Sequence, residues 1–111
     1  MRLWWLGLVM LLACSAPAPA SSASKRARGA AVFAQSGCPH CHTIRGVGGT
    51  KGPDLSGVGR RLKEAQMRRQ IVQGGDVMPS FGDALQETDL SDLLSYLRSC
   101  RDKKKTLPNT P

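Results

Sequence analysis

Five consecutive residues constrain this chain more than any other feature: Cys38-Pro39-His40-Cys41-His42, two cysteines with two residues between them and a histidine directly after. On a helical turn, thiols at positions i and i+3 face the same side. Both can then form thioether bonds to the two vinyl groups on one edge of a porphyrin, with His42 placed under the iron. This C-x-x-C-H run is the attachment signature of c-type haem. We therefore expect one covalent haem c, held through Cys38 and Cys41.

Without a bound cofactor, the chain has few large side chains from which to build a hydrophobic core. Its 111 residues can hold one small domain, which excludes a multidomain enzyme. The domain that we expect, residues 25–101, has only Phe33, Phe81 and Tyr96 as aromatic residues. Domains of this size usually need a disulfide, a metal or another staple, because burial scarcely offsets chain entropy.

The first residues have the pattern of an export signal. Met1-Arg2 precedes the apolar run 3–12, which is too short to span a bilayer. Leu11-Leu12-Ala13-Cys14 is similar to a bacterial lipobox. The lipobox interpretation predicts a signal peptide over residues 1–13 and a lipid on Cys14.

A second cleavage site competes with the lipobox, because Ala18-Pro19-Ala20 fits a small-x-small signal and would place the signal over residues 1–20. The lipobox is favoured because residues 15–24 contain only Ser, Ala and Pro, the composition of a linker. We expect residues 14–24 to tether a periplasmic or otherwise exported domain to a membrane through the lipid.

The net charge of +8 is concentrated at the ends of the chain. The middle, residues 30–100, holds only one excess positive charge, which argues against a nucleic-acid surface. Residues 102–111 are expected to form a basic, disordered tail. Within the domain, residues 45–69 carry seven bases and two acids, whereas residues 70–100 carry one base and five acids. This asymmetry predicts redox partners with acidic docking surfaces.

Two other chemistries use the same cysteines. Cys38-Pro39-His40-Cys41 is similar to the active site of periplasmic thiol oxidants of the thioredoxin superfamily, in which the first thiol has a depressed pKa. Those motifs follow a strand, whereas the segment before Cys38 has a helical pattern and no β-rich run follows it. Zinc binding is disfavoured because no second pair of ligands exists.

The second axial ligand of the iron is found by elimination. His40 and His42 are the only histidines, and His40 lies inside the attachment loop. Met78 lies among the glycines and proline of residues 74–81, which forbid helix and can lay a side chain onto a flat ring. Met67 lies in a predicted helix beside Ile71, where packing is the simpler interpretation. We expect His42 and Met78 to ligate the iron.

Taken together, these features resemble the class I monohaem cytochromes c, in their compact bacterial form. Gly29 and Phe33, with Leu93 and Tyr96, are similar to the contact where the first and last helices of that family cross.

The resemblance also implies roles around the haem. The segment 52–57 is similar to the loop whose proline, here Pro53, accepts a hydrogen bond from the proximal histidine and fixes its orientation. Arg60 and Arg61 are similar to the stretch that supplies an arginine near a haem propionate, and the resemblance does not separate the two. Only 35 residues lie between His42 and Met78, so the chain resembles the compact bacterial members and not the longer ones.

The expected fold is all-α, a class I cytochrome c fold of three to four helices and glycine-rich loops around one haem. The first helix is expected from Ser24 or Lys25 to Ser36, with Ser24 as a possible N-cap. Residues 43–55 are expected to form a loop, and a middle helix to cover residues 62–73. The last helix is expected over residues 87–100, with Leu90, Leu93, Leu94 and Leu97 as its buried stripe. Cys100 continues that stripe as a partly buried thiol, with an intermolecular disulfide as the alternative.

Covalent haem with histidine and methionine ligands leaves no open coordination position, which favours electron transfer over catalysis. We therefore predict a one-electron carrier that is not an enzyme and has no small-molecule substrate. A haem c subunit docked in a larger oxidoreductase is the alternative. A haem catalyst or ligand sensor, which requires Met78 to be displaced, and the thiol oxidant rank lower.

Overall fold

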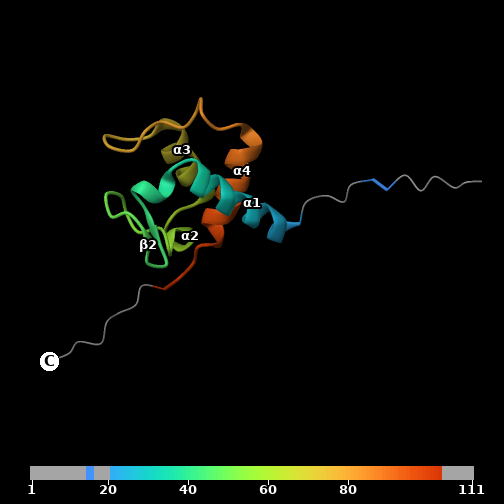
Figure 1. Ribbon diagram of the computed structural model, residues 1–111, viewed down its shortest axis with the longest axis horizontal. Helices are drawn as coiled ribbons and strands as arrows, with labels where there is room; N and C mark the ends of the chain where they lie inside the picture. Colours follow the sequence, from blue (N-terminus) through green and yellow to red (C-terminus); the bar gives the residue numbers. More distant parts are fainter. Residues whose placement is uncertain (1–14, 17–20, 104–111) are drawn as a thin grey trace, which may run out of the picture.

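The computed structural model describes residues 15–16 and 21–103, and it is predominantly helical (Figure 1). Its elements are α1 (Ser22–Gln35), a 3₁₀ turn η1 (Cys38–His40), β1 (Thr43–Ile44), β2 (Val47–Gly48), α2 (Val58–Arg61), α3 (Glu64–Gln73) and α4 (Glu87–Ser99). The all-α expectation is confirmed. In the described part of the chain, the only strands form one antiparallel hairpin with Ile44 opposite Val47.

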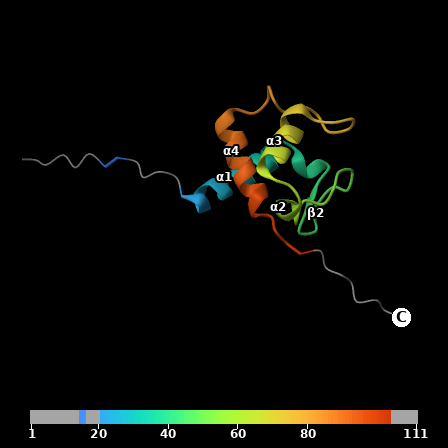
Figure 2. The ribbon, with the colours of Figure 1, turned by 180° about the vertical axis from the view of Figure 1, so that it is seen from behind.

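Helices α1 and α4 cross at the centre of the molecule and are in close contact, as both views show (Figures 1 and 2). A Cβ on Gly29 would overlap the carbonyl oxygen of Asp92 and lie 2.6 Å from Cβ of Tyr96, so only glycine permits this approach. The rings of Phe33 and Tyr96 meet edge to face, with centroids 5.8 Å apart. Beside them, Arg28 Nε donates to Asp92 Oδ2 at 2.9 Å.

The core lies between α4 and the helices that pack on it. Leu93 and Leu94 are each 1% exposed, and Leu90 and Leu97 complete the stripe. Met67 and Ile71 of α3, one turn apart, are buried against the same cluster. The remaining buried hydrophobic members are Phe33, Ile44, Val58 and Cys100.

The boundaries of the first helix differ from those expected from the sequence. Its N-cap is Ser21, whose hydroxyl accepts a hydrogen bond from the Ser24 amide, so Ser24 is not the cap. Residues 22–24, assigned to the linker by composition, are helical. Several serines lie at the start of the helix, and each could act as the N-cap. The observed cap, Ser21, makes the helix about one turn longer than a cap at Ser24 would.

The middle of the chain forms two helices where its sequence pattern predicted one. The helix expected over residues 62–73 begins at Glu64, because Leu62 is extended (φ −121°, ψ 143°) and separates α3 from the short α2. The glycine-rich segment 43–55 contains the hairpin, whose two turn residues, Arg45 and Gly46, have φ of 50° and 79°.

None of the helices among the described residues is both long and apolar enough to cross a bilayer. The signal over residues 1–13, the lipid site Cys14 and tail residues 104–111 lie outside the described residues.

Candidate haem site

A cavity of about 840 Å³ opens between the η1 turn, the 51–55 loop, the end of α2 and the 75–81 loop. Its volume is in the range of roughly 300–1,000 Å³ that is usual for cofactor sites. Most of the side chains around it are apolar or small, with a few polar groups. The lining residues are Ser36, Gly37, Cys38, His40, Cys41, His42, Lys51, Gly52, Pro53, Leu55, Val58, Arg61, Leu62, Gln70, Gly75, Asp76, Val77, Met78, Pro79 and Phe81.

The two cysteines of the attachment run are held by one tight turn. Gly37 ends the preceding helix with φ of 80°, and Pro39 lies at the start of η1. The Cys38 carbonyl accepts from the amides of Cys41 and His42, at 3.2 and 3.0 Å. Both thiols are free, half-buried and face the same cavity. Burial raises the pKa of the Cys38 thiol, the opposite of what a thiol oxidant needs.

His42 is fixed by the loop opposite the turn. Its Nδ1 lies 2.7 Å from the carbonyl oxygen of Pro53, a hydrogen bond in which the ring nitrogen donates and which leaves Nε2 free to bind a metal. A Cβ on Gly52 would lie 2.5 Å from Cε1 of His42, so glycine lets the loop pass close to the ring. The Gly52 amide donates to the Cys41 carbonyl at 2.7 Å, which joins the loop to the attachment turn.

Met78 reaches the cavity from the other side, on the loop between α3 and α4. Gly74 starts the loop with φ of 69°, and the Gly75 amide donates to the Met78 carbonyl at 3.0 Å. Nε2 of Gln70 lies 3.7 Å from the Met78 sulfur, a weak hydrogen bond. Met67, in contrast, is 3% exposed in the core and does not line the cavity.

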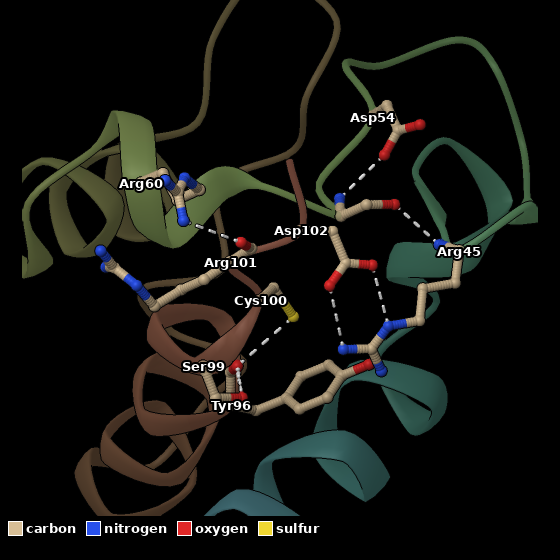
Figure 3. Close-up of polar contacts among 9 residues, drawn as sticks. Arg45, Asp54, Arg60, Tyr96, Ser99, Cys100, Arg101 and Asp102 are labelled. Carbon is tan, nitrogen blue, oxygen red and sulfur yellow. Dashed lines mark hydrogen bonds and ion pairs between the residues drawn. The ribbon is translucent and has the colours of Figure 1, made fainter. Parts of the chain in front are cut away.

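The two adjacent arginines have different surroundings. Arg61 lines the cavity, and its Nη2 donates to the carbonyl of Asp54 at 2.7 Å. Arg60 is not among the lining residues: its Nη1 donates to the carbonyl of Arg101 at 3.3 Å (Figure 3). Consecutive residues of a helix point about 100° apart, so the two side chains leave α2 in different directions.

Several lining residues were not selected by the sequence analysis. Lys51 lies directly before the segment 52–57 and Gln70 lies in the predicted middle helix, but neither residue belongs to a motif. The apolar walls come from three separate segments: the 51–55 loop, α2 with the residue after it, and the 75–81 loop. They are Leu55, Val58, Leu62, Val77 and Phe81. Glycine spacing indicated that loops would wrap the cavity but gave no sign of which side chains they would contribute.

These residues fit haem c. Two thiols line one side of the cavity together with a histidine whose Nε2 is free, and a methionine thioether approaches from a separate loop. A zinc site has no support, since the described residues contain no group of three or more His, Cys, Asp or Glu side chains close enough to hold a metal.

A helical domain of this size around such a cavity defines a small monohaem cytochrome c of class I. A family model described as "Cytochrome C oxidase, cbb3-type, subunit III" matches residues 24–97, and the chain belongs to this cytochrome c family. The cofactor of the chain is therefore covalently bound haem c, as the attachment run predicted.

Two curated relatives are similar to the chain. The "Cytochrome c-553-like" protein of Synechocystis sp. (strain ATCC 27184 / PCC 6803 / Kazusa) is 40% identical over 73 residues, which cover 65% of this chain and 66% of that protein. The "Cytochrome c oxidase subunit 2" of Alkalihalophilus pseudofirmus (strain ATCC BAA-2126 / JCM 17055 / OF4) is 32% identical over 87 residues, 67% of this chain. The chain spans only 25% of that relative's length. No solved structure gives a significant match.

Proposed function

We propose that the protein is a one-electron carrier with histidine and methionine axial ligation, working in a periplasmic or membrane-surface electron-transfer chain. The observation that carries the proposal is the convergence of Cys38, Cys41, His42 and Met78 on one cavity. When bound, the haem supplies one-electron chemistry at its iron. The chain supplies the attachment, the two ligands and the apolar walls.

Each residue has a defined task in this proposal. Cys38 and Cys41 form the thioethers, and His42 and Met78 bind the iron. Pro53 keeps His42 in the tautomer with the proton on Nδ1. Arg61 is the arginine assigned to a propionate, because Arg60 lies outside the cavity lining.

The arrangement favours a carrier over a catalyst. If His42 and Met78 both bind the iron, a substrate or gas could bind there only after one of these two residues leaves. The soft thioether of Met78 favours Fe(II), and the apolar walls act in the same direction, so both raise the reduction potential. Ligands that stay in place in both oxidation states also keep the reorganisation small.

A redox and ligand-binding titration of the purified holoprotein tests this proposal. A carrier should titrate reversibly with one electron, and the reduced protein should not bind carbon monoxide. Rapid binding of carbon monoxide to the unmodified protein would show an open position and would favour a catalyst or sensor.

A second candidate is a haem c subunit docked permanently in a larger oxidoreductase. It is supported by the family description and by the relative named as an oxidase subunit, of which this chain spans 25%. Gentle purification from membranes discriminates between the two. A docked subunit copurifies in fixed stoichiometry, whereas a mobile carrier separates from its partners.

We also propose that the domain is exported, is held at a membrane by a lipid on Cys14, and docks on acidic partner surfaces. The docking proposal is supported by Lys51 and Arg61, two of the basic residues in 45–69, which line the cavity. Reduction and oxidation rates with partners should then fall as salt rises. Mass spectrometry of the mature N-terminus tests the anchor, and an unmodified start at Ser21 would exclude it.

A further inference from the structure

Directly after α4, residues 100–102 lie along residues 56–59, the end of the loop after the hairpin and the start of α2. We call residues 100–102 the C-terminal clasp. The Asp102 amide donates to the Ser56 carbonyl at 3.0 Å, and the Cys100 carbonyl accepts from the Gly59 amide at 2.9 Å. Arg101 Nη1 donates to the Gly59 carbonyl at 2.6 Å. The clasp lies beyond residues 24–97, the part matched by the family model.

One glycine makes this approach possible. A Cβ on Gly57 would lie 2.6 Å from the carbonyl oxygen of Asp102. A Cβ on Gly59 would instead overlap the carbonyl of Arg98, near the end of α4. Contacts of this kind between backbones leave no room for side chains. The clasp is therefore built into the packing of the loop and is not a chance contact of a chain end.

An ion pair joins the clasp to the hairpin turn (Figure 3). Arg45 Nε donates to Asp102 Oδ2 at 3.0 Å and Nη2 to Oδ1 at 3.4 Å. The turn has φ of 50° at Arg45 and 79° at Gly46. A two-residue turn of this type favours asparagine at the first position, so arginine there is held against its backbone preference. The backbone of the turn therefore does not account for arginine at this position, whereas the side chain has a partner in Asp102.

From this ion pair, a chain of hydrogen bonds leads to His42. The Arg45 amide donates to the Ser56 hydroxyl at 2.7 Å, and the Ser56 amide donates to Asp54 Oδ1 at 2.8 Å. Asp54 follows Pro53, whose carbonyl is 2.7 Å from His42 Nδ1. The clasp thus fixes the same short loop that carries the hydrogen-bond acceptor of His42.

We infer that Asp102 is a positioning residue for His42: paired with Arg45, it locks residues 53–56 so that the Pro53 carbonyl stays on Nδ1. The inference rests on the proposed role of His42 as an iron ligand. A firm hydrogen bond at Nδ1 makes the ring a better electron donor through Nε2, which favours Fe(III). Loosening the clasp should therefore raise the reduction potential.

Two truncations of the full holoprotein separate the clasp from the tail. A chain ending at Lys103 loses residues 104–111 and keeps the clasp, whereas a chain ending at Cys100 loses Arg101 and Asp102 as well. We expect the longer chain to match the intact protein. The shorter chain should show a higher midpoint potential and several-fold faster amide exchange at Gly52 and Leu55, with little change at Leu93 and Leu94 in α4.

Single substitutions keep the test independent of the truncations. Asp102→Asn keeps the shape and removes the charge. Asp83→Asn is its control, because Asp83 is exposed and forms no ion pair within the described part of the chain. Arg45→Asn suits the turn better but removes the ion pair. If Arg45 matters only for the turn, Arg45→Asn should leave the protein as stable as before or more stable, with an unchanged reduction potential. If its ion pair with Asp102 holds the clasp, the reduction potential should rise as in Asp102→Asn.

The outcomes are distinct. A higher potential in Asp102→Asn and Arg45→Asn, with faster exchange at Gly52, supports the inference. Unchanged potentials overturn it, even if exchange becomes faster, because the clasp would then be only structural. Either outcome can be read only if the intact protein carries covalent haem with a methionine ligand, which its absorption spectrum reports. An intact protein whose spectrum lacks the signature of a methionine ligand would contradict the proposed function and not this inference.

Discussion

At the crossing of α1 and α4, Gly29 and Phe33 touch Asp92 and Tyr96 directly, whereas the walls around His42 and Met78 stand apart around about 840 Å³. The first region is completed by the chain's own side chains. The second is built from turns and loops and lacks the atoms to fill itself. This domain therefore has one half that packs without a cofactor and one half that depends on its cofactor.

The largest effect is expected when the cofactor is removed. In a Cys38→Ser/Cys41→Ser variant, no thioether can form, so haem should be lost on denaturation and the thermal midpoint should fall by at least about 10 °C. The fall reflects the loss of packing around the cavity. Cys100→Ser is the matched control, because its thiol lies in the core and not in the cavity.

A comparable haem content and thermal midpoint in the double variant and its control would contradict the division into two halves. Calorimetry and an absorption spectrum after unfolding provide both readings.

Removing one of the two proposed iron ligands should change the properties of the haem site and leave the packing of the helix crossing unchanged. Met78→Ala is expected to lower the reduction potential and to let carbon monoxide bind the reduced protein. Met67→Leu, in the core, should leave the spectrum unchanged. A Met78→Ala protein with the original potential and spectrum would show that another group binds the iron.

The helix crossing is tested by adding one carbon to it. Gly29→Ala places a methyl group against the Asp92 carbonyl, and we expect a loss of about 1–3 kcal/mol by chemical denaturation. In an exposed helix the same change would stabilise by up to about 1 kcal/mol, so propensity acts against the expected result. Ala31→Gly, exposed in the same helix, measures that propensity. A stabilised Gly29→Ala protein would mean that the crossing is looser than described.

The smallest effect is a pH dependence at the end of α4. Burial raises the pKa of Cys100 above its ordinary value of 9.0, although Arg45 acts in the opposite direction. Burial also raises the pKa of Tyr96. The unfolded thiol ionises first, so its contribution is complete below about pH 9 and is lost as pH rises through the higher folded pKa. Cys100→Ala should flatten, without abolishing, the fall in unfolding free energy above pH 9. An unchanged slope would exclude the thiol as a cause.

Sequence patterns predicted the helices well where one residue type repeats. The leucines of α4 marked a buried stripe, whereas the crossing at Gly29 and Phe33 was implied by the family resemblance. The break at Leu62 was missed because this residue lies inside a run with a helical pattern. The hairpin at Arg45 was missed because each of its strands has only two residues, too few to show an alternating pattern.

The site divides in the same way. Cys38, Cys41 and His42 form a contiguous motif, and Met78 could be selected by elimination, so all four could be named before the fold was known. Arg60 and Arg61 could not be separated without the direction of α2. The pairing of Arg45 with Asp102 joins residues 57 positions apart, and the composition near Asp102 resembles a disordered tail. Nothing in the sequence links them.

The central claim is that a haem is bonded to this chain through sulfur and ligated from both sides. Its most direct measurement is the haemochrome spectrum of the exported protein, matured with the haem-attachment machinery and then denatured. The account predicts one haem per chain that stays with the polypeptide. A colourless chain, or haem that separates from the chain on denaturation, would contradict it.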